Sequence, residues 1–250
     1  MDLGIEGRIA LVMGASKGIG RGIATALARE GARVAIASRS LERLEQTAGE
    51  IDGEAVPFAA DTGDLERLAR LPAEVSERLG PVEILVTNTG GPPPGGALDA
   101  ELDQWRHAYE NLILAPRVLV AAVLPGMRER GWGRIVNVGS SATREPIPGL
   151  ALSNAHRPGL LGWLKTLSDE VAADGVTVND IATGRFATDR LMANWGGREE
   201  MKRGAVQGIP AARLGDPDEY GDLVAFLCSE RAGYITGSSI PIDGGLRRSL

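Results

Sequence analysis

Residues 13–20 read Met-Gly-Ala-Ser-Lys-Gly-Ile-Gly, and this short stretch decides the fold. An apolar run at residues 8–13 leads into it, and Ile19, Ile23 and Leu27 follow at helical spacing. Glycines between a strand and an amphipathic helix let the backbone approach a pyrophosphate, and the helix N-terminus supplies free N–H donors. The stretch predicts a dinucleotide-binding turn, with a structural turn in a cofactor-free fold as the alternative. The turn residues expected to hold the cofactor are Gly14, Ser16, Lys17, Gly18, Ile19 and Gly20.

Short apolar runs alternate with segments of helical period along the rest of the chain. The expected strands are residues 8–13, 33–38, 55–60, 84–87, 134–138, 177–182 and 239–242. Beyond the first helix, the expected helices are residues 41–50, 65–79, 102–127, 153–173 and 217–229. The strand runs are apolar throughout, which is typical of parallel strands covered by helices on both faces. The pattern predicts an α/β, Rossmann-type doubly wound fold with about seven parallel strands, in a single domain over residues 1–250.

Composition argues against several classes of function. The net charge of −6 argues against a nucleic-acid or anionic-membrane partner, because phosphate binding needs a basic face. No apolar stretch looks long enough to cross a bilayer, so we expect no membrane partner and a cytoplasmic protein. One cysteine, Cys228, and two distant histidines, His107 and His156, provide neither a disulfide framework nor a zinc site. No metal is therefore expected.

Two irregular stretches follow expected strands. Residues 90–96 combine three prolines with two glycine pairs, and residues 183–210 are long enough to form a lid over a site. Both would lie at the carboxyl ends of strands, where open α/β sheets bind ligands, although plain surface loops are the alternative. Apolar residues of the second stretch cover a substrate or pack the lid onto the core: Phe186, Leu191, Met192 and Trp195.

Further motifs follow the glycine turn in a fixed order. They are Thr87-Asn88-Thr89-Gly90, Asn111 in Glu110-Asn111-Leu112, Ser140 at the end of the fifth strand, Thr188, Tyr234-Ile235-Thr236-Gly237 and Asp243-Gly244-Gly245. With Gly14-x-x-x-Gly18-x-Gly20, this set resembles the short-chain dehydrogenase/reductase family over nearly the whole chain. The resemblance is closest to 3-oxoacyl-carrier-protein reductases and glucose-dehydrogenase-like members.

The resemblance implies roles for individual residues. Asp61 is expected to contact adenine, Asn88 and Gly90 to line the cofactor, and Thr188 to touch the nicotinamide carboxamide. Asn111 would order a proton-relay water, and Ser140 matches the catalytic serine. The substrate implied is a ketone or secondary alcohol, and the assembly implied is a homotetramer formed through two long helices and the C-terminal strand.

The second strand indicates which dinucleotide is bound. It ends Ala37-Ser38-Arg39, without the acidic residue that normally binds an adenosine ribose. Arg39 and Lys17 instead offer cations to a 2′-phosphate, which a guanidinium fork suits well. We therefore expect NADP(H) rather than NAD(H), with solvated surface charges as the alternative.

The family pattern breaks at the proton-transfer pair. Tyr-x-x-x-Lys, with its tyrosine thirteen residues after the serine, is replaced by Ser153 and Arg157. A phenol beside a cation can exchange protons near neutrality, whereas an aliphatic hydroxyl is a far weaker acid. Arg157 can still bind the nicotinamide ribose, as the family lysine does, but arginine stays charged and cannot relay its own proton.

Three interpretations follow from this break. In the first, hydride transfer persists, and His156 or a water ordered by Ser140, Ser153 and Asn111 supplies the proton. In the second, the protein binds NADP(H) with little chemistry, as a sensor or an inactive subunit. In the third, the site does other chemistry, as in dehalogenating relatives that carry arginine at the lysine position. Those relatives keep the tyrosine and lack the glycine motif, so the analogy is poor. Asn111, Ser140 and Thr188 would surround the nicotinamide end, and their presence makes sense if that ring still reacts, so we favour the first interpretation.

Overall fold

The computed structural model describes residues 1–189, 191, 204 and 206–249. Its strands are β1 (Ile9–Met13), β2 (Arg33–Ser38), β3 (Ala55–Ala59), β4 (Ile84–Thr87), β5 (Gly133–Val138), β6 (Val176–Thr183) and β7 (Ser239–Ile242). Its main helices are α1 (Gly18–Arg29), α2 (Leu41–Glu50), α3 (Leu65–Arg78), α4 (Leu102–Tyr109), α5 (Ala115–Glu129), α6 (Ala151–Val171) and α9 (Pro217–Leu227). The expected strands and helices are confirmed, with ends that shift by one or two residues, except that the helix expected at residues 102–127 is interrupted.

The seven strands form one parallel sheet in the order β3-β2-β1-β4-β5-β6-β7. The order reverses direction at β1, which pairs with β2 on one side and β4 on the other. In doubly wound sheets this switch point leaves a crevice outside the carboxyl ends of the two strands. The predicted fold class is confirmed, and it brings the residues that follow β1 and β4 side by side.

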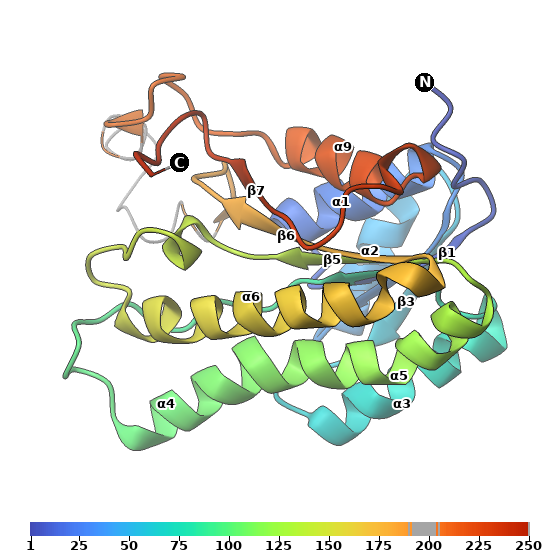
Figure 1. Ribbon diagram of the computed structural model, residues 1–250, viewed down its shortest axis with the longest axis horizontal. Coiled ribbons are helices and arrows are strands. Elements are labelled where there is room, and N and C mark those ends of the chain that lie inside the picture. Colours follow the sequence, from blue (N-terminus) through green and yellow to red (C-terminus); the bar gives the residue numbers. More distant parts are fainter. Residues whose placement is uncertain (190, 192–203, 205, 250) are drawn as a thin grey trace.

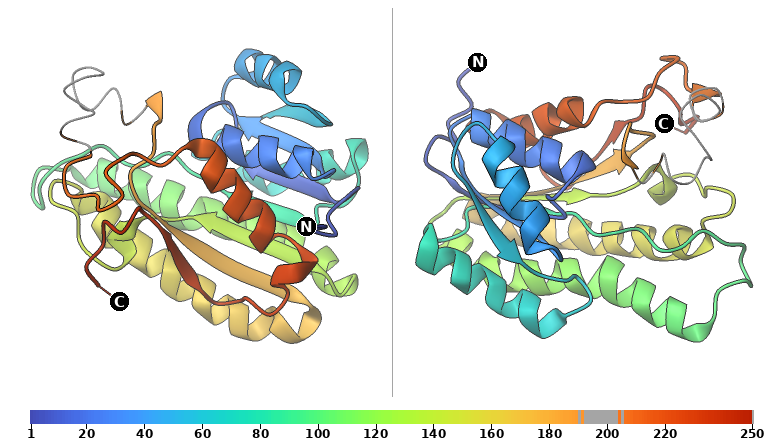
Figure 2. Two further views of the ribbon diagram at one scale, coloured as in Figure 1. Left: turned by 90° about the horizontal axis from the view of Figure 1, so that it is seen from above. Right: turned by 180° about the vertical axis from the view of Figure 1, so that it is seen from behind.

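Two helical layers cover the sheet (Figure 1, Figure 2). Helices α1 and α9 lie on one face, and their contact is close because a Cβ on Gly22 would stand 2.3 Å from the Pro217 carbonyl oxygen. Helices α3, α5 and α6 cover the other face, where their leucines and valines pack on alternate strand residues. Strands with both faces buried explain why their sequences read as continuous apolar runs.

The helix expected at residues 102–127 is not regular. A π-helical turn, η1 (Glu110–Leu114), separates α4 from α5. The apolar periodicity continues through it, so the pattern alone predicted an unbroken α-helix. Such turns are often found at functional sites, and this one carries Asn111.

The same helical stretch corrects an expectation about membranes. Leu102–Glu129 is long and apolar enough to cross a bilayer by length and composition, with 39% of its most apolar window buried. Length and composition alone do not separate a membrane span from a core helix. This stretch packs against α3 and α6 through buried residues such as Leu119 and Val123.

Candidate active site

The glycine turn and β4 meet at the switch point of the sheet. Gly14 has φ +62°, and a Cβ there would stand 2.8 Å from Asn88 Nδ2. A Cβ on Gly20 would stand 2.2 Å from the Gly14 carbonyl oxygen. Neither position can hold a larger residue, so the backbone forms an open cradle at the start of α1. This is the shape that a pyrophosphate needs, and the residues present therefore fit a dinucleotide.

The rest of the turn lies close to two other segments. Gly18 has φ +55°, and its Cβ position lies 3.2 Å from Thr188 Cγ2, so Thr188 is adjacent to the turn. The Ser16 carbonyl oxygen accepts a hydrogen bond from Thr47 Oγ1 at 3.2 Å, which ties the turn to α2. Ile19 packs onto the core at the first turn of α1.

The cations expected to meet a 2′-phosphate are exposed. Arg39 follows β2 and forms no ion pair with any residue that the structure describes. Lys17 is the N-cap of α1, and its Nζ lies 3.9 Å from Asp189 Oδ2, with both side chains largely in solvent. An exposed pair of this kind contributes little, so Lys17 remains available to an anion.

Asp61 and Gly90 lie at the same edge of the sheet. Asp61 lies two residues beyond β3 and is exposed, with its Oδ1 accepting from the Gly63 N–H at 3.0 Å. Gly90 lies three residues beyond β4 and is also exposed. The carboxyl ends of β1 to β4 therefore carry every residue expected to line the adenosine half.

Ser140, Ser153 and Arg157 lie around the carboxyl end of β5. Arg157 Nε donates to Ser153 Oγ at 3.2 Å, and its Nη1 donates to the Val138 carbonyl oxygen at 3.2 Å. Ser140 Oγ accepts from the Ala142 N–H at 3.1 Å. Each hydroxyl thus accepts a hydrogen bond, and among the described residues neither donates one. Both O–H groups are free to point at a substrate oxygen or a water.

Asn111 is held firmly in the π-helical turn. Its Oδ1 accepts from Thr62 Oγ1 at 2.6 Å, and its Nδ2 donates to the His107 carbonyl oxygen at 2.9 Å. His107 Nε2 lies 3.1 Å from the same Nδ2. The side-chain amide is therefore fixed by its own helix and by the segment after β3.

His156 is placed away from the serine hydroxyls. Its Nδ1 lies 2.7 Å from the Leu152 carbonyl oxygen, within α6. Its ring packs against Trp105 at 5.3 Å and Tyr109 at 6.3 Å between centroids. These contacts are those of a side chain packed between α6 and α4.

Tyr220 is the one tyrosine buried near the site among the described residues. It enters from α9 on the opposite face of the sheet, and its hydroxyl lies 2.8 Å from Thr183 Oγ1. Its side chain is fully buried, and this burial raises the pKa of the phenol well above its usual range. It therefore cannot act as a proton donor in this site.

Two sets of hydrogen bonds between distant segments lie near the site, and no sequence pattern predicts them. Gly95 N–H donates to the Gly149 carbonyl oxygen at 2.7 Å, and Ala151 N–H donates back to Gly95 at 3.2 Å. The proline-containing stretch at residues 90–96 is thereby attached to the first residue of α6. It borders a small hollow lined by residues including Pro93, Gly96 and Leu152. On the other side, Glu145 Oε1 accepts from backbone N–H groups of Arg248 and Ser249 in the C-terminal segment.

The expected lid is described only in part. Phe186 is buried against Tyr220, with ring centroids 5.2 Å apart, so it packs onto the core. Met192 and Trp195 lie outside the described residues.

Known proteins similar to this chain share its fold and length. A family model described as enoyl-(acyl carrier protein) reductase matches residues 14–247. Nodulation protein G of Azospirillum brasilense is 38% identical over 245 residues, covering 96% of this chain and 98% of the relative. The 3-oxoacyl-[acyl-carrier-protein] reductase FabG of Vibrio cholerae is 34% identical over 244 residues, covering 98% and 99%. L-Sorbose reductase of Gluconobacter frateurii, solved with NADPH and L-sorbose, has a TM-score of 0.94 at 30% identity over 100% of both chains.

A parallel sheet with a glycine cradle at its switch point defines a Rossmann-type dinucleotide-binding protein. Within that class, the relatives and the matching family model are decisive, and the chain belongs to the short-chain dehydrogenase/reductase family.

Proposed function

We propose that this protein transfers a hydride between NADP(H) and a ketone or secondary alcohol, with its proton supplied by a hydrogen-bonded water rather than by a tyrosine. The observation that carries the proposal is the pair of hydroxyls on Ser140 and Ser153. Each accepts a hydrogen bond from an N–H donor and keeps its own proton free. Ser140 follows β5 and Ser153 lies on α6, and their spacing in the sequence is the one expected for the family's serine and tyrosine.

The cofactor is NADP(H). L-Sorbose reductase, which shares the fold over the full chain, was solved with NADPH, and Arg39 and Lys17 stand at the end of β2 and the start of α1. We assign the adenosine half to Gly14, Gly20, Arg39 and Asp61. When bound, NADP(H) supplies or accepts the hydride, and the chain's own side chains orient the partner and move the proton.

Proton movement in this site follows from the hydroxyl geometry. The permanently charged guanidinium of Arg157 donates to Ser153 Oγ, which directs the hydroxyl proton away from α6. Ser140 and Ser153 then act as donors to a carbonyl oxygen, stabilising the charge that develops on it. Because neither hydroxyl ionises near neutrality, net proton supply falls to a water, and Asn111 is the fixed amide that we assign to ordering it.

The remaining features of the site are assigned by position. The lid expected at residues 183–210 lies partly outside the described residues; its described part includes Thr188, which we place beside the cofactor, next to the glycine turn of this single-domain protein. We place Gly90 along the cofactor and the hollow beside Leu152 at the substrate.

A cofactor-binding protein without reductase activity is the second candidate. The observation that favours it is Arg157, which stays charged and donates to both Ser153 and Val138 and so cannot replace the family lysine in a relay. A sensor or an inactive subunit would fit this arrangement.

We also propose a soluble cytoplasmic homotetramer. The surface that supports this assembly is formed by α4, α5 and α6, where Leu102 is 72% exposed and Gly162 has nothing within 4 Å of its Cβ position. Apolar exposure of this kind is covered by a second copy in an isologous pair of helices. Light scattering of Gly162→Glu against the native chain would show a smaller species if this surface is the interface.

Titration with NADPH and NADH, followed by addition of a panel of ketones to the NADPH complex, tests the proposal. Tight NADPH binding with loss of reduced-ring absorbance supports an oxidoreductase. Tight binding without turnover on any ketone or hydroxy compound supports the second candidate. Binding of neither cofactor contradicts both.

A further inference from the structure

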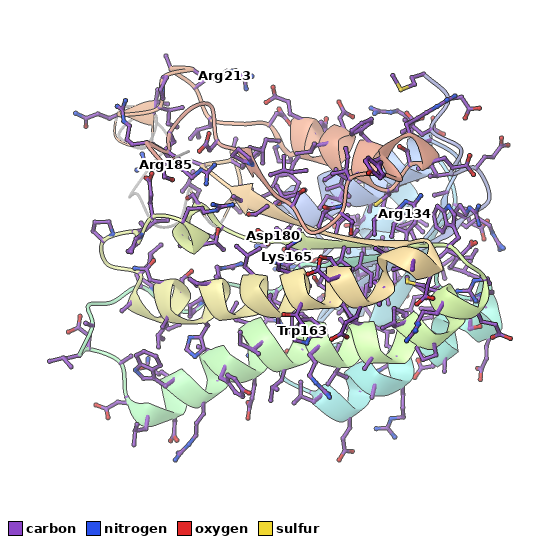
Figure 3. All side chains as sticks on the ribbon, viewed as in Figure 1. Arg134, Trp163, Lys165, Asp180, Arg185 and Arg213 are labelled. Atoms are coloured by element: carbon purple, nitrogen blue, oxygen red, sulfur yellow. The ribbon has the colours of Figure 1, made fainter. Side chains whose placement is uncertain are left out.

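A buried carboxyl lies beneath the site and has no part in the chemistry described above. Asp180 on β6 is 1% exposed and lies where the sheet faces α6 (Figure 3). Asn137 Nδ2 donates to its Oδ1 at 2.7 Å, and Ser239 Oγ donates to its Oδ2 at 2.8 Å. Thr87 Oγ1 in turn donates to Asn137 Oδ1 at 2.8 Å. Burying an ionised carboxyl is costly unless hydrogen bonds and an opposite charge compensate it.

Asp180 and Arg157 hold the same short piece of β5. Arg157 Nη1 donates to the Val138 carbonyl oxygen. The next residue, Gly139, lies so close to Asp180 that a Cβ there would stand 2.2 Å from Oδ1. The Asp180 carboxyl therefore packs against the backbone of Gly139, and the Arg157 guanidinium binds the carbonyl of the residue before it. Arg157 and Asp180 both contact the end of β5, so their opposite charges lie near the same backbone segment.

The groups that act on Asp180 come from three elements. Burial raises the pKa of its carboxyl, whereas the positive charges of Arg157 on α6 and Arg144 after η2 (Ser141–Thr143) oppose that rise. From α9, the Tyr220 phenol feels the negative charge of Asp180. Arg144 is exposed, so its charge is screened by solvent. Arg157 is half-buried and is the partner that water screens less.

We propose that Asp180 is a positioning residue whose buried carboxylate is the counter-charge that holds Arg157 between Ser153 and β5. Arginine adds a permanent positive charge where the family has a lysine, which can shed its proton. A fixed negative charge beneath it offsets that change and keeps the guanidinium on Ser153 Oγ. The inference rests on the proposed function only for the role of Arg157, since both side chains hold these positions around the end of β5 without cofactor.

A double-mutant cycle read as a function of pH tests the pair. The proteins are the native chain, Arg157→Gln, Asp180→Asn and the double variant, and the readout is Tm from pH 5 to pH 8.5 without cofactor. Burial already raises the pKa of the Asp180 carboxyl in the native chain, and loss of the Arg157 charge raises it further, so folded Arg157→Gln keeps this proton to a higher pH than the folded native chain does. The unfolded carboxyl loses the proton above about pH 4 in both proteins. Stability of Arg157→Gln must then fall as pH rises, until the raised folded pKa is passed. Relative to the native chain, we expect Tm to fall by about 3 °C for each pH unit between the folded pKa of Asp180 in the native chain and its higher folded pKa in Arg157→Gln.

The double variant should lose this extra slope, because Asp180→Asn removes the titrating group and nearly keeps its shape. Other titrating groups are common to all four proteins and cancel. Equal Tm losses for Arg157→Gln at every pH, or an unchanged slope in the Asp180→Asn background, would overturn the proposal.

Arg157→Lys provides a test that needs no Asp180 variant, in case that variant does not fold. A lysine keeps the charge, so its Tm should follow pH as the native chain does. If Arg157→Lys and Arg157→Gln show the same slope, charge at this position does not stabilise Asp180. Because no cofactor is used, this outcome is separate from any failure of NADPH binding or turnover.

Discussion

The glycine turn after β1 and the first two turns of α6 lie at the same edge of one sheet, yet they stand in different relations to their family. In the turn, each required glycine is present, and Gly20 abuts the Gly14 backbone so closely that no side chain fits. In α6, we expect Ser153 and Arg157 in place of the family's proton-transfer pair, and Arg157 bonds to Ser153 and to β5. Backbone contacts constrain the turn, whereas side-chain hydrogen bonds hold this part of α6.

This contrast separates binding from proton transfer. A residue required by backbone geometry has no tolerated substitute, because any Cβ produces a clash. A residue required for its acidity can be replaced when another group or a water supplies the proton. Mutations in the glycine turn should therefore change the affinity for NADPH, whereas mutations at the start of α6 should change turnover.

The largest expected effect is at the turn. Gly20→Ala places a Cβ 2.2 Å from the Gly14 carbonyl oxygen, so the cradle must open or α1 must shift. We expect NADPH affinity to fall by more than about tenfold, with a stability loss of about 2–4 kcal/mol from overpacking. Calorimetric titration and thermal unfolding measure the two effects. Gly49→Ala in α2, where nothing lies within 4 Å, is the matched control and should bind normally.

A smaller effect is expected from the charge after β2. Arg39→Asp removes the cation assigned to the 2′-phosphate and supplies the carboxylate that suits a free ribose. NADPH affinity should fall by about tenfold or more, and NADH affinity should rise. Arg70→Asp on the exposed face of α3 makes the same charge change away from the site. Equal losses in both variants would show that Arg39 acts only through net charge.

A still smaller effect is expected from pH. Neither Ser153 nor Arg157 titrates near neutrality, so turnover between pH 6.5 and pH 9 should change by less than about threefold. A steady-state pH profile with a constant ketone concentration measures this. A clear loss of turnover above an apparent pKa near 6.5 would instead identify a histidine as the acid.

The smallest effect is expected at His156. Its ring packs on Trp105 and Tyr109, so His156→Gln should cost about 1 kcal/mol of stability or less and leave turnover within about twofold. Unfolding by urea and the same ketone assay check both values. A large loss of turnover with unchanged stability would place His156 in the proton path.

Sequence patterns predicted the parts of this molecule that local chemistry determines. The glycine turn, the strands and the helix positions follow from residue type and spacing, because backbone conformation and burial act over a few residues. The replacement of the family's proton-transfer pair by Ser153 and Arg157 was inferred from their spacing after Ser140, and it stays a prediction.

The features that sequence reasoning missed depend on contacts between distant segments. Asp180 meets Asn137 only because β5 and β6 are neighbours in a set register. The Tyr220 hydroxyl reaches Thr183 Oγ1 from α9, a helix distant in sequence from β6. The π-helical turn at Asn111 leaves the apolar periodicity intact, so its irregular backbone gives no sign in the pattern.

The central claim is that binding and proton transfer are carried by different regions, with Ser153 in the second. Ser153→Ala, compared with Ser76→Ala on the exposed face of α3, tests it in one experiment: NADPH affinity and ketone turnover measured on the same preparation. The account predicts an NADPH Kd within about twofold of the native value and turnover reduced by about tenfold or more, as for the loss of a hydrogen-bond donor to a developing charge. Unchanged turnover, or a loss confined to affinity, would contradict it.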